Sequence, residues 1–378
     1  MPKNHAYYCY LNKYISRLKP LQELYQDTII VFSNKPSTNP TRKNPMKALM
    51  MTKYGSISTS LAFQSVAMPK ASANQVVIRV CASSINPIDY KILRGDFKAL
   101  SKVQFPQGIG RDVSGVVVEV GKQVHHFKVG DAVLSRIDES LVGTIADYVA
   151  SESHHTTLKP EQLTHEEAAS IPLAGLTALQ ALVTTANLKA GEKVLIHAGS
   201  GGVGSIAVQL AKSIGAFVAT TTSTANAELL TKLGADQVID YKQENYLEQV
   251  SDFDVVFDTL GGDYTLDAFK VIKKGGKVVS ISGEVDDILA QDLGLNLIIR
   301  TILKLKARKI VKAAAKKQAM YRMILMSPNG VQLAELVDLY VNKKIKPVID
   351  SVYPFTKSIE ALEHLLKGRA KGKILIKH

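Results

Sequence analysis

Cysteine and tryptophan are nearly absent from this sequence of 378 residues, which has two cysteines (Cys9 and Cys81) and no tryptophan. Two cysteines exclude both a disulfide framework and a zinc site built from cysteines. No apolar run approaches the roughly 20 residues that a membrane-spanning helix needs. Near the N-terminus the longest aliphatic stretch is residues 29–32, which is too short for the core of a signal peptide. We therefore expect a protein of a reducing, cytoplasmic compartment.

Acidic residues are scarce in two segments, and this imbalance accounts for the formal net charge of +13. Residues 1–45 contain seven Lys and Arg against two acidic residues, and residues 300–322 contain nine and no acid. The rest of the chain is close to neutral. Aromatic residues make up only 6% of the sequence. This argues against a dedicated nucleic-acid-binding protein, because such proteins stack bases on aromatic rings.

The pattern of the sequence changes twice along the chain. Residues 1–45 show no sustained period and end in a Pro-, Asn- and Ser-rich linker, so we expect a disordered extension, with a targeting segment as the alternative. Residues 46–170 contain several strand-like runs and predict a β-rich domain. From residue 171 apolar strands alternate with helices, which predicts a parallel, doubly wound α/β sheet. The strands expected in this sheet are residues 193–198, 217–222, 237–239, 254–257 and 277–281.

A glycine-rich turn follows the first of these strands and opens a helix that Gly215 ends. In such a unit, glycines allow a tight turn and the close approach of a pyrophosphate, and the last glycine lets the helix pack near the strand. The helix N-terminus adds unpaired N–H groups and a positive dipole. We therefore predict a dinucleotide site, with a purely structural turn as the alternative. The predicted contacts are Ala198, Gly199, Ser200, Gly201, Gly202, Val203 and Gly204.

The second strand of the α/β sheet bears on the choice of dinucleotide. It ends in Thr222 and Ser223, where an NAD-binding protein would place a carboxylate for the ribose 2′-hydroxyl. Without that carboxylate a 2′-phosphate is not repelled, so the sequence favours NADPH. The positive charge for this phosphate is missing from the expected place, and Lys242 or Arg369, Lys371 and Lys373 could supply it. Three more predicted contacts follow later strands, namely Tyr241, Thr259 and Leu260.

Six motifs together resemble the medium-chain dehydrogenase/reductase superfamily, in its zinc-free quinone oxidoreductase (zeta-crystallin-like) and enone/alkenal reductase branch. They are residues 84–91 (SINPIDYK), 110–117 (GRDVSGVV), 174–178 (AGLTA), 191–204 (GEKVLIHAGSGGVG), 258–262 (DTLGG) and 368–373 (GRAKGK). The resemblance implies a GroES-like β-rich catalytic domain from residues 46–170 and 328–378, with a Rossmann domain at 171–327 between them. It also implies a homodimer. Ser282 and Gly283 would pass near the nicotinamide, and Lys373 belongs to the closing motif.

Zinc members of the superfamily carry a cysteine where this chain has Asn86, and a His-Glu pair where it has Arg111 and Asp112. An amide, a guanidinium and one carboxylate cannot form a tetrahedral zinc site, so we expect no metal. Without a Lewis acid, hydrogen-bond donors must stabilise the negative charge of the reaction. This suits quinones and α,β-unsaturated carbonyl compounds (enones and 2-alkenals), with Asn86, Tyr90 and Lys91 as candidate catalytic residues.

Structural interpretations of the same residues stay open. Asn86 before Pro87 is also a turn signal. Arg111 and Asp112 are more typical of a structural ion pair, and His197, inside an apolar strand, is typical of a core or near-cofactor histidine.

Residues 297–326 contain no Gly or Pro and predict one basic helix. The simpler interpretation is a solvated helix that covers the substrate cleft; the alternative is a weak contact with an anionic surface. This helix also allows a second function, a catalytically weak NADPH sensor that contacts an anionic partner.

Overall fold

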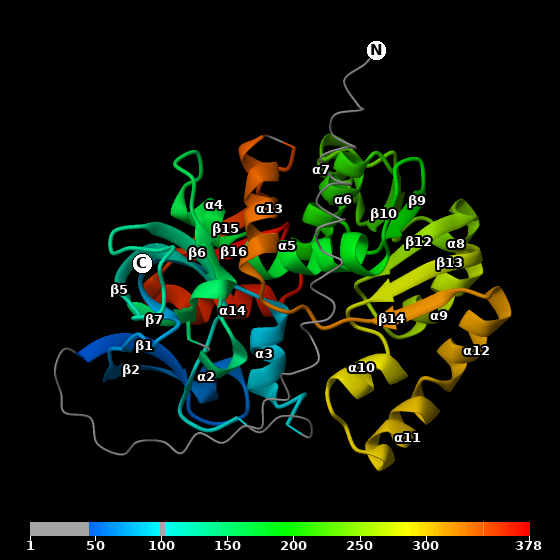
Figure 1. Ribbon diagram of the computed structural model, residues 1–378. Coiled ribbons are helices and arrows are strands. Elements are labelled where there is room, and N and C mark those ends of the chain that lie inside the picture. Colours follow the sequence, from blue (N-terminus) through cyan, green and yellow to red (C-terminus); the bar gives the residue numbers. More distant parts are fainter. Residues whose placement is uncertain (1–44, 99–102, 142, 343) are drawn as a thin grey trace. The chain divides into compact units, whose positions relative to one another are not determined.

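The computed structural model describes residues 45–98, 103–141, 143–342 and 344–378 (Figure 1). The extension predicted for residues 1–45 lies outside these residues, except for Pro45, which begins strand β1 (Pro45–Met51). The described chain contains a parallel α/β sheet and two sheets of mainly antiparallel strands. The predicted fold class, a GroES-like domain with a Rossmann domain, is confirmed.

The Rossmann sheet has six strands, all paired in parallel, in the order β11-β10-β9-β12-β13-β14. The chain starts in the middle at β9, winds outward to β11 and then crosses to the other side at β12, as in a doubly wound fold. The strands are β9 (Lys193–Ile196), β10 (Phe217–Thr222), β11 (Gln237–Asp240), β12 (Phe253–Asp258), β13 (Ile272–Ser280) and β14 (Met320–Met323).

Helices cover both faces of this sheet, which explains why its central strands β9 and β12 carry apolar residues on both sides. Successive side chains of a strand point to opposite faces. Val194 and Ile196 accordingly join one core cluster, whereas Leu195 joins the other. Helices α5 (Pro172–Leu179), α6 (Gly202–Ile214) and α13 (Gly330–Val341) pack in the first cluster. Helices α8 (Tyr246–Gln249), α9 (Asp263–Val271) and α12 (Arg308–Lys317) pack in the second.

Strand β14 corrects the prediction of one basic helix over residues 297–326. The structure has α10 (Asp287–Asp292), then two helices, α11 (Leu297–Lys306) and α12. Gln318 then takes a left-handed conformation (φ 52°) that ends α12. Met320 pairs in parallel with Lys277 of β13, so residues 320–323 form the sixth strand. A pairing partner about 40 residues upstream overrides the local preference for helix.

The GroES-like part contains a seven-stranded sheet in the order β15-β16-β3-β5-β6-β8, with β7 on β3, and a small sheet β2-β1-β4. Strand β16, near the C-terminus, pairs antiparallel with β3 (Ile374 opposite Ile85), so the C-terminal segment joins the sheet that the N-terminal part of the GroES-like domain forms. The strands are β2 (Leu61–Ala67), β3 (Gln75–Ile85), β4 (Gln107–Gly108), β5 (Asp112–Val120), β6 (Ala132–Arg136), β7 (Tyr148–Glu152), β8 (Thr156–Leu158), β15 (Ile349–Pro354) and β16 (Lys373–Lys377).

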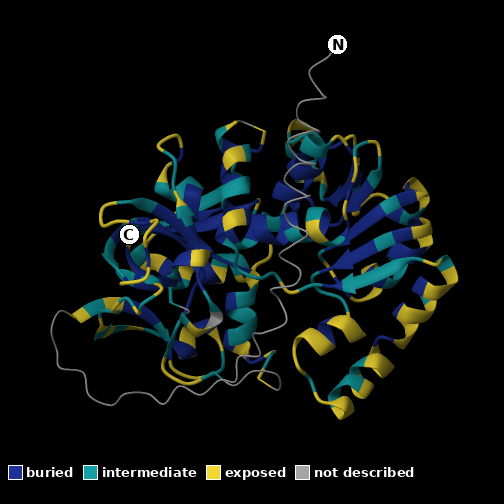
Figure 2. Ribbon diagram, in the orientation of Figure 1, coloured by how far each residue is buried: buried dark blue, intermediate teal, exposed yellow. Residues whose placement is uncertain are grey.

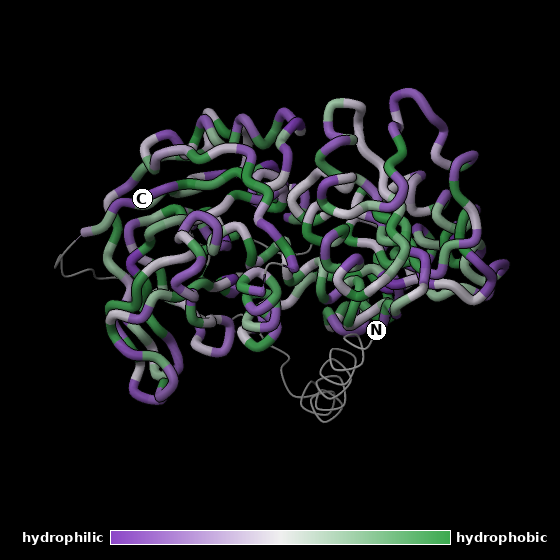
Figure 3. Tube along the Cα trace, turned by 90° about the horizontal axis from the view of Figure 1, so that it is seen from above, coloured by the Kyte–Doolittle hydropathy of each residue, from purple (hydrophilic) through white to green (hydrophobic). Residues whose placement is uncertain are grey.

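The remaining α-helices of the described chain are α2 (Ile57–Ser60), α3 (Pro87–Arg94), α4 (His165–Ala169), α7 (Ala227–Lys232) and α14 (Ser358–Leu366). A π-helical segment, Gln180–Thr185, continues α5. Buried residues are concentrated in the sheets (Figure 2), and hydrophilic segments lie mainly at the outer turns (Figure 3). In the part of the chain that the structure describes, no helix has the length and apolarity needed to cross a membrane.

Candidate functional site

The glycine turn lies between β9 and α6, where the sequence predicts it, with Gly201 as the N-cap of the helix. A Cβ on Gly204 would stand 2.3 Å from the Ala198 carbonyl oxygen, so this glycine lets the helix pack against the turn. A Cβ on Gly199 would meet Thr220 Oγ1 at 2.1 Å. At Gly201 the nearest atom would be 3.4 Å away, which leaves its outer side open. The turn therefore combines close internal packing with an accessible helix N-terminus, the arrangement that binds phosphate.

Ser200, within the turn, is held by the end of the second strand. Its hydroxyl oxygen accepts hydrogen bonds from Thr222 Oγ1 and Asn226 Nδ2, both at 3.1 Å. Thr222 is buried, and Ser223 is half-buried beside it. Two predicted contacts, Thr222 and Ser200, therefore touch each other in the structure.

A carboxylate that the sequence interpretation missed stands near this point. Asp240 ends β11 in register with Thr222, and Thr224 Oγ1 donates to its carboxylate. That hydrogen bond lowers the pKa of Asp240. Tyr241 follows, with 52% of its surface exposed and its N–H donating to the Thr222 carbonyl. Only the pairing of β10 with β11 reveals that Asp240 lies here, since the two residues are 18 positions apart in the sequence.

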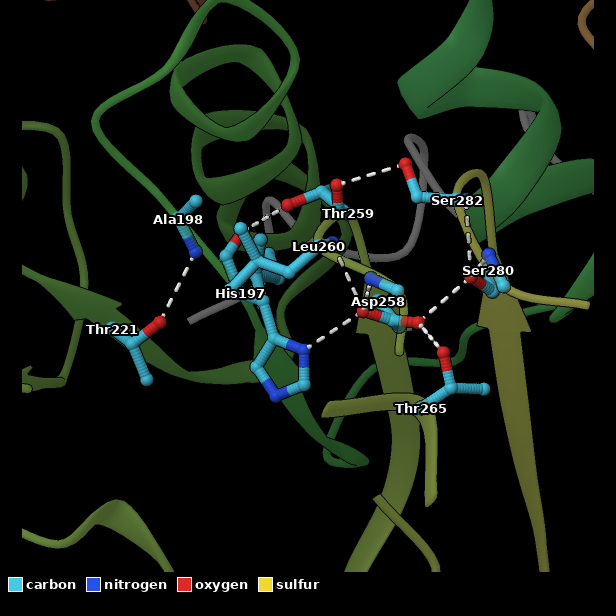
Figure 4. A network of polar contacts seen from close by, with 12 residues as sticks. His197, Ala198, Thr221, Asp258, Thr259, Leu260, Thr265, Ser280 and Ser282 are labelled. Carbon is cyan, nitrogen blue, oxygen red and sulfur yellow. Dashed lines mark hydrogen bonds and ion pairs between the residues drawn. The ribbon is translucent and has the colours of Figure 1, made fainter. Parts of the chain in front are cut away.

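Asp258, at the C-terminal end of β12, organises the opposite side of the turn (Figure 4). One carboxylate oxygen accepts from the backbone N–H groups of Leu260 and Gly261, each at 3.0 Å, and faces His197 Nδ1 at 3.2 Å. The other oxygen accepts from the hydroxyls of Thr265 and Ser280. Burial raises the pKa of this carboxyl, but the contact with His197 and the other hydrogen bonds outweigh it, so the net pKa is lowered.

Two loops depend on this network. Ser280 Oγ accepts from the N–H groups of Ser282 (3.2 Å) and Gly283 (2.7 Å), and Ser282 Oγ donates to the Thr259 carbonyl at 3.1 Å. The structure thus brings the predicted contacts Thr259, Leu260, Ser282 and Gly283 together at the C-terminal ends of β12 and β13. Open α/β sheets bind their ligands at this edge.

His197 is fully buried next to the turn. Its ring meets those of Tyr246 and Tyr264 edge-on, with centroids 5.4 and 5.5 Å away. Within the described residues its Nε2 atom has no hydrogen-bond partner. The histidine is therefore both a core residue and a neighbour of the predicted cofactor site.

A second polar cluster surrounds Asp112 in the GroES-like part. Its Oδ2 atom accepts from Ser84 Oγ (2.6 Å) and Asn86 Nδ2 (2.9 Å), and Lys373 Nζ lies 3.4 Å away. Its Oδ1 atom accepts from the N–H of Leu173 at 2.8 Å. Lys373 Nζ also donates to Asn86 Oδ1. Both ends of the Asn86 amide are thus engaged inside the protein, with 2% of the residue exposed.

Asn86 also begins α3, in agreement with its interpretation as a turn residue: it is the N-cap, and its backbone N–H donates to Asp89 Oδ2 at 2.8 Å. Arg111 forms its buried ion pair with Asp89, not with Asp112. The ion pair suggested for Arg111 and Asp112 is therefore wrong. Neighbouring residues of an extended chain point to opposite sides, so these two side chains reach different partners. Asp89 and Asp112 each hold a backbone N–H group and a cationic side chain.

Tyr90 and Lys91 lie on α3 and are half-buried. The Arg94 guanidinium lies over the Tyr90 ring, 5.3 Å from its centroid. Among the described residues, neither side chain joins the hydrogen-bond network of Asp112. The structure therefore does not bring the three candidate catalytic residues into one cluster.

Lys373 connects the glycine turn with the Asp112 cluster. A Cβ on Gly202 would lie 2.9 Å from Lys373 Cδ, so the stem of the lysine passes the first residue of α6. The preceding residue, Gly372, donates its N–H to the Ser200 carbonyl at 2.9 Å. Lys373 and Gly372 thus bring the glycine turn and the Asp112 cluster into contact.

This combination of fold and site defines a nucleotide-dependent oxidoreductase with a GroES-like domain and a Rossmann domain. Two family models match the chain: the alcohol dehydrogenase GroES-like domain over residues 72–161 and zinc-binding dehydrogenase over residues 233–376.

Relatives and solved structures agree with these models. The chain is 37% identical to 2-methylene-furan-3-one reductase of Solanum lycopersicum over 90% of its length and 81% of the relative. It is 35% identical to the chloroplastic NADPH-dependent alkenal/one oxidoreductase of Arabidopsis thaliana, over 88% and 79%. The quinone oxidoreductase structure from Coxiella burnetii superposes on this chain with a TM-score of 0.78 and 33% identity, over 89% of this chain and 100% of that one. The Escherichia coli quinone oxidoreductase complexed with NADPH gives a TM-score of 0.74 and 26% identity, over 88% of this chain and 100% of that one. The chain belongs to the medium-chain dehydrogenase/reductase superfamily and is an oxidoreductase of its quinone and alkenal/one reductase group.

Proposed function

We propose that this oxidoreductase binds NADPH and reduces a quinone or an α,β-unsaturated carbonyl compound by hydride transfer, without zinc. The observation that carries the proposal is the position of Lys373, whose stem passes the glycine turn at Gly202 and whose ammonium group contacts Asn86 and Asp112. A dinucleotide on the turn would therefore lie beside the candidate catalytic cluster. The relatives that act on alkenals, enones and quinones support this substrate class.

The residues of the turn suit a dinucleotide, but the Asp240 carboxylate lies in register with Thr222, so the preference for NADPH is supported by the relatives and not by the charge at this point. The N–H groups at the start of α6, next to the open side of Gly201, would hold the pyrophosphate. The Thr222 and Ser223 end of β10 would receive the ribose phosphate, and the loops that Asp258 ties together would flank the nicotinamide. When bound, NADPH supplies the hydride for the β-carbon of an enone or for a quinone.

The chain itself must stabilise the negative charge that develops on the substrate oxygen. Lys373 and Arg111 are the buried cations of the site, and each is already matched by a carboxylate, Asp112 and Asp89. Their role is to hold Asn86 and the start of α3 in place. The half-buried Tyr90 hydroxyl and Lys91 ammonium on α3 remain the donors proposed for the substrate oxygen, and Tyr90 is the proposed proton donor to the α-carbon.

The positions that correspond to zinc ligands do not suit a metal ion. Asn86 and Asp112 both contact the Lys373 ammonium, and Arg111 is paired with Asp89. A cation at this place would be repelled by the lysine, and its ligands would first have to leave their partners. Over the described residues, no group of three or more His, Cys, Asp and Glu could hold a metal.

The direct test is the oxidation of NADPH by the purified full chain with a quinone, a 2-alkenal and an enone, each repeated with NADH and with EDTA. We expect turnover with at least one acceptor, a preference for NADPH, and no effect of the chelator. Metal analysis should find zinc far below one ion per chain. Normal NADPH affinity without turnover of any acceptor would contradict the proposal and favour the sensor alternative.

A further inference from the structure

Helix α11 exposes an apolar face that the fold does not use. None of its ten residues is buried. Leu297, Ile298, Ile302 and Leu305 expose 75%, 74%, 51% and 64% of their surfaces. At 3.6 residues per turn these side chains occupy one arc of about 140°. Single exposed apolar side chains are common on protein surfaces, but several gathered on one helix face indicate a contact surface.

The opposite side of α11 attaches the helix to the protein. Ile299 and Leu303 point to this side and are half-buried. Arg300 forms an ion pair with Asp287 of α10 (3.0 Å). The following helix, α12, is anchored by Ile310 and Ala314, which pack under the Rossmann sheet. The apolar arc of α11 therefore belongs to a helix whose inner side is half-buried and whose arc residues are exposed, and Figure 2 colours most of this helix as exposed.

Basic residues border the apolar arc. Lys304 and Lys306 lie next to its two edges, and Arg308, Lys309 and Lys312 continue on the exposed side of α12. Neither helix contains an acidic residue. An apolar arc bordered by lysines is the pattern of a helix that lies in a membrane interface, with the arc among acyl chains and the ammonium groups at anionic headgroups.

We propose that α11 and α12 form a docking surface for an anionic lipid bilayer. A nucleic acid would satisfy the basic residues but would leave the apolar arc in water. A second copy of the chain, docked face to face, would cover the arc but would bring two sets of basic residues together, and neither α11 nor α12 contains an acid to pair with them. A bilayer with acidic headgroups satisfies both features at once. The proposal concerns a surface outside the reductase site and does not depend on the proposed reaction.

The experiment is co-sedimentation of the full chain with vesicles of phosphatidylcholine alone and of phosphatidylcholine with about 30% phosphatidylglycerol. We expect binding to the anionic vesicles, little to the neutral ones, and a clear loss between about 50 and about 500 mM salt. Equal binding to both kinds of vesicle, or none to either, would overturn the proposal.

Two variants separate the apolar and the basic contributions. Ile298→Ser with Ile302→Ser should weaken anionic-vesicle binding by at least about tenfold, and so should Lys304→Glu with Lys309→Glu. The matched control, Lys122→Glu with Lys128→Glu, makes the same change of charge at exposed lysines of the GroES-like part and should retain binding. Melting temperature confirms that each variant folds.

Light scattering and a duplex DNA binding assay, run on the same variants, test the other occupants. If the serine variant turns a dimer into a monomer and leaves vesicle binding intact, the face is an interface between copies and the proposal fails. If the glutamate variant loses DNA binding while vesicle binding persists, the basic surface serves a nucleic acid and the proposal fails as well.

Discussion

His197 and Asp258 face each other at the ends of two neighbouring strands, with 3.2 Å between Nδ1 and Oδ1, and neither side chain is exposed. A second contact joins the same strand ends, because Thr259 Oγ1 donates to the His197 carbonyl at 2.8 Å. The histidine directly precedes Ala198 and the glycine turn. The carboxylate holds the backbone of Leu260 and Gly261 and, through Ser280, that of Ser282 and Gly283. The pair therefore ties the phosphate side of the proposed cofactor site to its nicotinamide side.

Replacing Asp258 with Asn should disturb the nicotinamide side of the site. An amide nitrogen cannot accept hydrogen bonds, so the donors to one of the two Asp258 oxygens lose their acceptor. Each buried donor left without a partner lowers the free energy of unfolding by about 1–3 kcal/mol. We expect a KM for NADPH raised at least about tenfold and a lower melting temperature. The control is Asp254→Asn, at the other end of the same strand, where the carboxylate binds Lys193 N–H and Lys273. An unchanged KM in Asp258→Asn would contradict this role.

Two glycines of the turn should respond differently to alanine. In Gly204→Ala the methyl group would collide with the Ala198 carbonyl oxygen, so unfolding should become easier by about 1–3 kcal/mol. In Gly201→Ala the new Cβ has an ordinary 3.4 Å contact, so stability should hold while NADPH affinity falls, because the methyl group would stand where a phosphate approaches. Thermal melts and NADPH titrations of the two variants check the distinction. Equal losses of stability would contradict it.

Lys373 and Asp112 should prove energetically coupled. Lys373→Met removes the cation but leaves the buried Asp112 carboxylate, so we expect about 3 kcal/mol lower stability and much lower activity. Adding Asp112→Asn should recover much of the stability without recovering activity, because a neutral amide no longer needs the cation. A double-mutant cycle by denaturant unfolding measures this coupling. Additive effects of the two changes would show that the contact has no energetic role.

A buried histidine, His155, and a half-buried one, His378, should make the protein sensitive to mild acid. Burial lowers the pKa of His155 and of His378 to about 4 each, and for His155 the neighbouring His154 adds to the effect. Between pH 6.5 and 4 the unfolded chain binds protons at these residues that the folded chain excludes, so these two histidines lower the stability as the pH falls through this range. Urea unfolding at several pH values should show this slope, and His155→Gln should flatten it. The exposed control His125→Gln should leave the slope unchanged.

The sequence predicts the glycine turn of the candidate site better than it predicts the Asp112 cluster. The glycine turn, its strand and its helix are local in the chain, and their order was predictable because turn chemistry and apolar alternation act over a few residues. The Asp112 cluster joins Asp112 to Ser84 and Asn86, to Leu173 and to Lys373, and these residues come from four separate segments. Motif resemblance pointed to Asn86 and Asp112, whereas the structural interpretation of Arg111 and Asp112 as an ion pair named the wrong partner for Arg111.

In residues 297–326, local composition determines one part of the structure and pairing with a distant strand determines the other. Their composition predicts helix, and helices α11 and α12 confirm this up to Lys317. Met320 to Met323 are a strand only because the edge of β13 offers them hydrogen bonds. The sequence alone determined the two kinds of domain, the phosphate turn and the distribution of charge, since these follow from local pattern and composition. Tertiary structure alone decided that Asp240 lies beside Thr222, that Arg111 pairs with Asp89, and that Lys373 passes the turn, because each contact joins residues that only the assembled sheets bring together.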